Sequence, residues 1–246
     1  MPLLFVVVPL IAFLYASVGF GGATGYLAVM TLFGVEPQEM ASTALMLNVI
    51  VAGISFTTYY HAGHLSPGLL LPFIITSIPA AFIGGSFKLS DRTYAIVLYA
   101  VLTFVAIRLL FFSRKQDEDQ PLRPVPFWLA LVIGALIGLL SGMVGIGGGI
   151  FLSPIILYAR WGHSKQAATV AAAFIVLNSI SGLLGRFLGG TIVLDAFSTS
   201  LVPFGVMGAL AGSWFGAQRF TNLSLRRLLG AIMSFAVSNF WLTLWR

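Results

Sequence analysis

The chain has 246 residues, of which 59% are hydrophobic and 8% are charged, and its formal net charge is +6. Soluble domains carry about 25% charged residues, so this composition excludes an ordinary water-soluble protein and indicates an integral membrane protein in a lipid bilayer. The basic residues lie scattered at the ends of apolar segments and form no basic stripe, which argues against binding to nucleic acid. The chain has no cysteine, which excludes disulfides, thiolate metal sites and a cysteine nucleophile.

Six long apolar runs predict transmembrane helices. Each supplies about the 20 residues that a helix needs to cross roughly 30 Å of hydrocarbon. The runs are continuously apolar and do not alternate with polar residues, so we expect helices and not the strands of a membrane barrel. The predicted spans are residues 39–60, 67–87, 92–112, 165–187, 197–218 and 224–245.

Two glycine-rich breaks interrupt the remaining apolar sequence, one in SVGFGGATGYLA and one in GMVGIGGGIFLSP. The first break separates residues 3–18 from 23–34, and the second separates 127–143 from 148–159. The second piece of each pair spans only about 18 Å and is too short to cross. We therefore predict two re-entrant helical hairpins. Their glycine tips should face each other or a shared pocket, because non-helical backbone at membrane depth must be buried in protein or line a wet cavity.

The two breaks belong to an internal repeat. An offset of 126 residues superposes Gly19, Gly21 and Gly22 on Gly145, Gly147 and Gly148. The chain thus divides into a first repeat (1–112), a charged linker (113–126) and a second repeat (127–246). Each repeat has three spans, an odd number of crossings, which would invert one copy relative to the other. The predicted fold is an all-α polytopic membrane protein of two inverted repeats, each a glycine-tipped re-entrant hairpin plus three transmembrane helices.

The distribution of basic residues predicts the orientation. With hairpins that do not cross, nine basic residues fall on one side and four on the other, and the positive-inside rule places the nine in the cytoplasm. If the first piece of each hairpin crossed fully, seven basic residues would fall on one side and six on the other, and the charges would not predict an orientation of the chain. We expect a cytoplasmic linker, both termini outside, and location in the cell (plasma) membrane. The nine are Arg108, Arg114, Lys115, Arg123, Arg160, Lys165, Arg219, Arg226 and Arg227, and the four are Lys88, Arg92, Arg186 and Arg246.

Paired glycine-interrupted segments in corresponding positions of inverted halves are typical of the binding site of a secondary transporter. A broken helix presents free N–H groups and the positive end of its dipole, which stabilise an anion where water is scarce. No carboxylate lies in the interior of any predicted helix, so an anionic substrate is favoured over a metal ion or an organic cation. The alternative is that the glycines serve only close helix packing. The candidate substrate-binding residues at the tips are Gly19, Gly21, Gly22, Ala23, Gly145, Gly147, Gly148 and Gly149.

These residues also carry a family resemblance. The segments GFGGATGY, ASTALMLN and, above all, GMVGIGGGIFLSPIIL followed by KQAATVAAAFIVLNSISGLLG resemble the sulfite exporter TauE/SafE family, also called the toluene-sulfonate uptake permease family. The resemblance covers both halves, although Ala23 and Ala28 stand where the second half has Gly149 and Pro154. It implies transport of small sulfur oxyanions or organosulfonates, such as sulfite or sulfoacetate, across a prokaryotic plasma membrane. The residues by themselves indicate only an anion-favouring secondary carrier.

Polar residues inside the spans are the next candidates. Asn48 and Asn178 form a matched pair whose NH₂ groups can donate to a sulfonate oxygen, or can instead satisfy carbonyls of the broken helices. The hydroxyls of Thr43 and Thr169 can donate to substrate or bond back to their own helix.

Three residues near the ends of spans are candidates for gating or coupling. Arg186 can clamp an anion bidentately or snorkel to the outer interface, and we favour snorkelling. His61 and His64 are expected on the same outer side, where either could titrate in a proton-coupled carrier or simply lie at the interface.

Two other functional classes stay open. An intramembrane enzyme is disfavoured because the spans show no paired aspartates, no HExxH and no nucleophilic serine motif. An anion channel could line its pore with the same glycine tips. No Walker motif or cofactor signature is present, so we expect no cofactor, and a homodimer is left as an open alternative.

Overall fold

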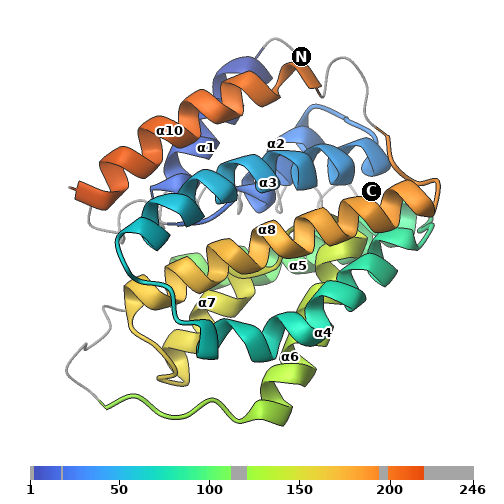
Figure 1. The fold of residues 1–246 in the computed structure, drawn as a ribbon. Coiled ribbons are helices and arrows are strands. Elements are labelled where there is room, and N and C mark those ends of the chain that lie inside the picture. The colour runs from blue at the N-terminus through green and yellow to red at the C-terminus, as the bar shows by residue number, and fades with distance from the viewer. Residues whose placement is uncertain (1–2, 18, 112–120, 194–198, 219–246) are drawn as a thin grey trace.

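A computed structural model shows the chain as a bundle of α-helices (Figure 1) and describes residues 3–17, 19–111, 121–193 and 199–218. The predicted last span, 224–245, lies outside these residues. The helices are α1 (Leu4–Ala16), α2 (Ala23–Leu32), α3 (Pro37–His61), α4 (Pro67–Ser86), α5 (Asp91–Phe111), α6 (Phe127–Val144), α7 (Gly149–Tyr158), α8 (Ser164–Leu188) and α10 (Val202–Gln218).

The observed helices match the predicted segments closely. The boundaries of α3, α4, α5 and α8 lie within two residues of prediction, whereas α10 begins five residues later than predicted. Prolines at the starts of α3 and α4 fit a first helical position, where the missing N–H costs nothing. By length and apolar composition, α3, α4, α6 and α8 are each able to cross a membrane. The described part of the chain is therefore that of a polytopic helical membrane protein.

The long helices α3 and α8 lie side by side at the centre of the bundle (Figure 1). They run antiparallel: Gln38 near the start of α3 lines the same pocket as Arg186 near the end of α8. Further along the pair, a methyl group of Leu45 lies 3.3 Å from the Cβ position at Gly182. Every other described helix is arranged around this pair.

The two predicted hairpins are present. Helix α1 turns back into α2, and a 2.7 Å hydrogen bond between the hydroxyls of Tyr15 and Thr24 joins the two helices. Helix α6 turns back into α7, and the Arg123 N–H donates to the Arg160 carbonyl over 2.8 Å, so this hairpin begins and ends at the same end of the bundle. The first hairpin leads into the start of α3 and the second into the start of α8. Because α3 and α8 are antiparallel, the open ends of the two hairpins lie at opposite ends of the central pair.

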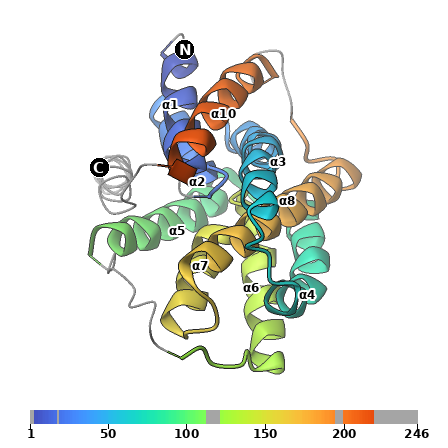
Figure 2. The ribbon, with the colours of Figure 1, turned by 60° about the vertical axis from the view of Figure 1, so that its left-hand side comes forward.

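The helices that form the hairpins differ in length. Helix α6 has 18 residues and extends about 27 Å, close to the thickness of the hydrocarbon, whereas α2 and α7 have 10 residues each and extend about 15 Å. Helix α5 lies against α7, where the rings of Phe104 and Phe151 are 5.8 Å apart between centroids (Figure 2).

Each half packs extensively on the other half. Helix α1 packs on α10, and α4 packs on α6 and α8. Glycines permit this close approach, because a Cβ at Gly138 of α6 would overlap the Ser77 carbonyl of α4, and one at Gly212 of α10 would overlap the Phe13 carbonyl of α1. In lipid, where apolar burial gives helices little reason to associate, such backbone contacts supply packing energy.

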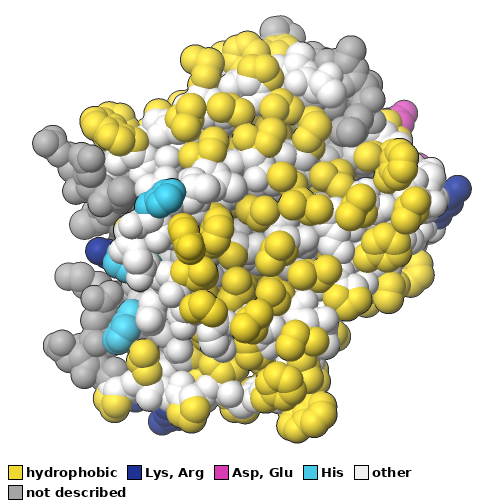
Figure 3. Space-filling model, viewed as in Figure 1, with side chains coloured by type: hydrophobic (Ala, Val, Ile, Leu, Met, Phe, Trp, Pro, Cys, Tyr) yellow, Lys and Arg dark blue, Asp and Glu magenta, His cyan; other side chains and the backbone are white. Residues whose placement is uncertain are grey.

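The outer surface has the character expected for contact with lipid. Figure 3 shows hydrophobic side chains over most of one face, with histidines at one end and basic side chains at both ends. Six of the described basic residues lie at the two ends of the bundle, divided as the sequence predicts. Arg123, Arg160 and Lys165 lie at the linker end, and Lys88, Arg92 and Arg186 lie at the opposite end.

Candidate functional site

The two glycine tips meet between the middles of α3 and α8. A Cβ at Gly147 would lie 2.6 Å from Asn48 Nδ2 and 2.8 Å from Ile175 Cγ2, and one at Gly21 would overlap Asn48 Oδ1 and lie 3.0 Å from the same methyl group. Both tips therefore face Asn48 of α3 and Ile175 of α8. The prediction that the tips face each other is confirmed, and sequence reasoning missed Ile175.

Left-handed glycines shape the two tips. Gly22 precedes α2 with φ +95° and Gly148 precedes α7 with φ +81°, values that residues with a Cβ rarely adopt. Gly145 ends α6 with φ +89°, and Gly19 has φ +83°. These turns direct the first N–H groups of α2 and α7 toward the junction of the two hairpins.

Asn48 joins the two tips directly. Its Oδ1 accepts a hydrogen bond from the Ala23 N–H over 3.1 Å, and its Nδ2 donates to the Ile146 carbonyl over 3.1 Å. Asn48 is completely buried. One side chain on α3 thus holds together the start of α2 and the turn after α6, which is the structural role considered for it from the sequence.

Several N–H groups at the junction remain available. Within the part of the chain that the structure describes, no hydrogen bond is formed by the N–H groups of Gly21, Gly22, Gly147, Gly148 or Gly149. A buried backbone N–H without a partner costs free energy, so such groups are expected to bond to water or a ligand. The positive ends of the α2 and α7 dipoles add to the attraction for an anion.

Asn178 does not repeat the role of Asn48. Its Nδ2 donates to the Phe174 carbonyl of its own helix over 2.7 Å, and its Oδ1 is buried without a partner. The next residue, Ser179, also has a buried hydroxyl without a partner, 3.0 Å from the Cβ position at Gly147. Sequence reasoning missed Ser179, although its position beside Asn178 in LNSIS could have suggested it.

Tyr26 is a second residue that sequence reasoning missed. Its hydroxyl is buried, has no partner, and lies 2.8 Å from the Cβ position at Gly22. The phenol therefore reaches back along α2 to the first tip. Its place in GFGGATGY, one turn after the glycines, was the available signal.

The two predicted threonines differ. Thr169 donates to the Lys165 carbonyl of its own helix over 2.8 Å, so its hydroxyl is committed to structure. The Thr43 hydroxyl is buried and has no partner among the described residues. Only Thr43 keeps a free donor.

Arg186 is buried, with 4% of its surface exposed, so the favoured prediction that it snorkels to the interface is wrong. Its Nη2 donates to the Met143 carbonyl over 2.7 Å and to the Gly142 carbonyl over 3.2 Å. Tyr94 donates to the adjacent Val144 carbonyl over 3.0 Å. These bonds satisfy the last carbonyls of α6, where the helix dipole favours a cation.

The prediction that His61 and His64 lie on the same side as Arg186 is wrong. His61 ends α3 and His64 follows it, whereas Gln38 at the start of α3 shares a pocket with Arg186. The two histidines are therefore at the end opposite Arg186, not on the same side. His61 is exposed, and its ring lies 5.7 Å from that of Tyr60. This arrangement is typical of residues at a membrane interface.

The junction itself carries no charged side chain. Residues 40–60 of α3 and 166–185 of α8 contain no acidic or basic residue. Within the described chain, no group of three His, Asp or Glu side chains could hold a metal ion. The polar groups available for a ligand are thus backbone N–H groups, hydroxyls and an amide, which suit the oxygens of a small anion.

Comparison with known proteins gives a consistent picture. A family model described as "Sulfite exporter TauE/SafE" matches residues 4–240. The probable membrane transporter protein y4hK of Sinorhizobium fredii is 35% identical over 225 residues, covering 89% of this chain and 91% of that protein. YjnA, a probable membrane transporter protein of Bacillus subtilis, is 26% identical over 231 residues, covering 87% and 89%. A probable membrane transporter protein of Haemophilus influenzae is 30% identical over 227 residues, covering 85% and 83%. No solved structure matches the chain.

Proposed function

Because the chain belongs to the sulfite exporter TauE/SafE family, we propose that it is a secondary transporter of small anions, with sulfite or an organosulfonate such as sulfoacetate as its substrate. The relatives that it resembles are named as probable membrane transporters, which supports transport over catalysis. The substrate class follows from the family and from the chemistry of the junction of the two hairpins.

One observation carries the proposal. Two helix N-termini with unpaired N–H groups meet at Asn48, between the middles of the two central helices. An anion here would bond to Gly21, Gly22 and Gly147 to Gly149 and would interact with the positive ends of both dipoles. Neutral donors bind an anion less tightly than a buried arginine would, which suits a site that must also release its substrate.

The mechanism that we propose is alternating access by two inverted repeats. The antiparallel central helices, and hairpins whose open ends lie at opposite ends of the bundle, support an approximate two-fold relation between the halves. Rocking of one repeat against the other would expose the tips first to one side of the membrane and then to the other. Asn48 would keep the tips joined during this motion.

The test is a flux measurement on purified protein in proteoliposomes. We expect saturable uptake of sulfite or sulfoacetate that is accelerated by unlabelled substrate loaded on the opposite side. A channel cannot show this counterflow. Flux without counterflow would therefore indicate a channel and contradict the proposal of a carrier. If no sulfur anion moves in a folded preparation but carboxylates do, the sulfur-anion assignment is wrong and the anion site is retained. A pH gradient imposed in parallel tests proton coupling.

A further inference from the structure

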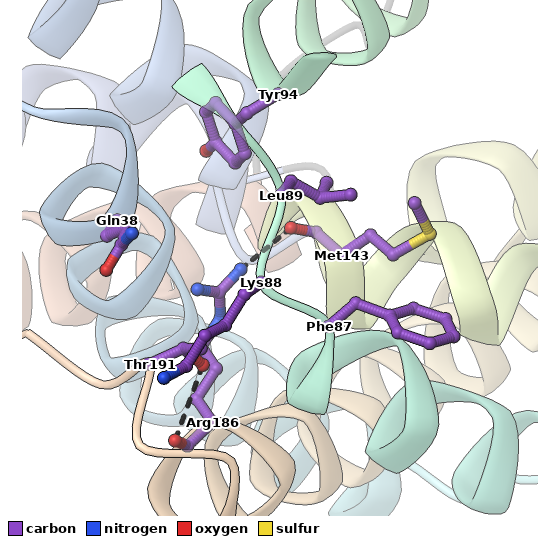
Figure 4. A pocket seen from close by; sticks show the side chains of 8 residues that line it. All are labelled: Gln38, Phe87, Lys88, Leu89, Tyr94, Met143, Arg186 and Thr191. Atoms are coloured by element: carbon purple, nitrogen blue, oxygen red, sulfur yellow. Dashed lines mark hydrogen bonds between the residues drawn. The ribbon is translucent and has the colours of Figure 1, made fainter. Parts of the chain in front are cut away.

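A second site with anion-binding character lies away from the glycine junction, at the end of the bundle opposite the linker. Gln38 of α3, Lys88 of the α4–α5 connection and Arg186 of α8 point toward one small cavity (Figure 4). Phe87, Leu89 and Met143 give the cavity apolar walls. Three elements thus bring two cations and an amide together.

The positive charge in this cavity is not balanced by an acidic side chain. Arg186 has no ion pair in the part of the chain that the structure describes, and no acidic residue lines the cavity. The end of α6 contributes only about half a negative charge through its carbonyls. A buried guanidinium with a second cation beside it therefore lacks a counterion, and buried charges in proteins are normally paired.

Donor groups remain available to a ligand in the cavity. Arg186 Nε is buried without a partner, and the side chains of Lys88 and Gln38 form no hydrogen bond with any described residue. The hydroxyls of Thr191 and Tyr94, by contrast, already donate to backbone carbonyls. Among the residues that line the cavity, only Arg186, Lys88 and Gln38 therefore keep free donor groups for a ligand.

The free volume limits the size of the ligand. It is about 10 Å³, roughly the space for one water-sized species. A water molecule would fill it without neutralising the charge. A chloride ion is somewhat larger but supplies one negative charge, and the exposed side chains of Lys88 and Gln38 can shift to admit it. We infer that this cavity binds a chloride-sized inorganic anion, held by Arg186 Nε, Lys88 and Gln38. The site is distinct from the proposed transport site and does not depend on the identity of the transported substrate.

Thermal unfolding of the purified full-length protein tests the inference. Sodium chloride or bromide is exchanged against sodium gluconate at constant ionic strength, with tryptophan fluorescence as the readout. An anion bound only to the folded state raises the Tm in a saturable way. We expect this rise in the unmodified protein. In Lys88→Gln, the halide concentration at half-effect should be at least about tenfold higher, because one charge-assisted contact is lost.

Arg92→Gln is the matched control, because it removes an exposed cation near the same end without touching the cavity. Crystals soaked in bromide should show an anomalous peak beside Arg186. A halide effect that is absent, or equal in Lys88→Gln and Arg92→Gln, would overturn the inference, as would a water in place of bromide. If Arg186→Gln fails to fold, the exposed residues Lys88 and Gln38 still carry the test, through Lys88→Gln and Gln38→Leu.

Discussion

Asn48 and Asn178 occupy corresponding positions in the two halves, yet only Asn48 bridges the glycine tips. The matched pair could be predicted from the sequence because an amide inside an apolar helix must find partners. Which partner each amide finds could not, because that depends on distances of a few tenths of an ångström between elements about 100 residues apart. The unpaired Oδ1 of Asn178 shows that a repeated residue need not keep a repeated contact.

The role of the second tip is tested by Gly147→Ala. A Cβ here would crowd Asn48, Ile175 and Ser179, so we expect transport to fall by at least about tenfold while the protein still folds. The measurement is substrate flux in proteoliposomes.

Gly190→Ala is the control for Gly147→Ala. Gly190 also has positive φ, +64°, but nothing lies within 4 Å of its Cβ position. This variant carries the same kind of backbone strain without the overlap. Equal loss of flux in both variants would assign the effect to strain and remove the tip from the site.

Ser179 and Ser181 allow ligand binding to be separated from folding. Ser179 has a buried hydroxyl without a partner, whereas Ser181 donates to the Ile78 carbonyl over 2.6 Å. We expect Ser179→Ala to weaken substrate binding about fivefold or more without lowering the Tm, and Ser181→Ala to lower the Tm without changing affinity. Isothermal titration and thermal unfolding measure the two effects. Unchanged affinity in Ser179→Ala would leave its hydroxyl outside the site.

Two residue predictions were wrong for different reasons. Arg186 lies near the end of its span, where a long side chain can either reach the interface or turn inward to carbonyls, and the sequence does not distinguish these outcomes. The location of His61 could have been deduced from the sequence. A helix that begins before Gln38 and crosses once must place residue 61 at the end of the bundle opposite Gln38.

At the level of helices, length and glycine content were enough to predict both hairpins. Helices α2 and α7 end after 10 residues each, as the short apolar pieces required. The glycines mark the breaks because only they adopt the left-handed turns found there. The extent of α6 was also predicted closely, as residues 127–143. Its 18 residues are enough to reach across most of the hydrocarbon, even though the chain then turns back.

Close packing between helices is tested with two helical glycines. A Cβ at Gly138 would overlap the backbone of α4, whereas nothing lies within 4 Å of the Cβ position at Gly53. Gly138→Ala should destabilise the fold by about 1–3 kcal/mol through overpacking. Gly53→Ala should be neutral or stabilise by up to about 1 kcal/mol, the difference in helix propensity. Thermal unfolding in detergent compares them, and a lower Tm for Gly53→Ala than for Gly138→Ala would contradict this account.

At the level of the whole molecule, the sequence could not predict which helices of one half pack on which helices of the other half. Helices α1 and α6 are similar in apolar composition, and nothing in either sequence specifies that α1 packs on α10 and α6 on α4. Sequence reasoning could assign spans because burial in lipid is a property of one helix. Pairing is a property of two helices, and many apolar surfaces are compatible with one another.

The proposed orientation is open to direct measurement because the chain has no cysteine of its own. Arg92 and Lys165 are exposed and lie at opposite ends of the bundle. In intact cells, a membrane-impermeant maleimide should label Arg92→Cys, and should label Lys165→Cys only after the membrane is permeabilised. Labelling of both from the same side would contradict the inverted arrangement, and the reverse pattern would contradict the orientation from the positive-inside rule.

The packing of α1 on α10 also bears on how the protein is made. Ala16 at the end of α1 and Val202 at the start of α10 are 186 residues apart. At synthesis rates of about 5–20 residues per second, α1 waits roughly 10–40 seconds for the helix on which it packs. During that time a cell must keep the first helix in the membrane without its partner. The newly made first half is then the part of the protein most open to degradation by quality-control proteases.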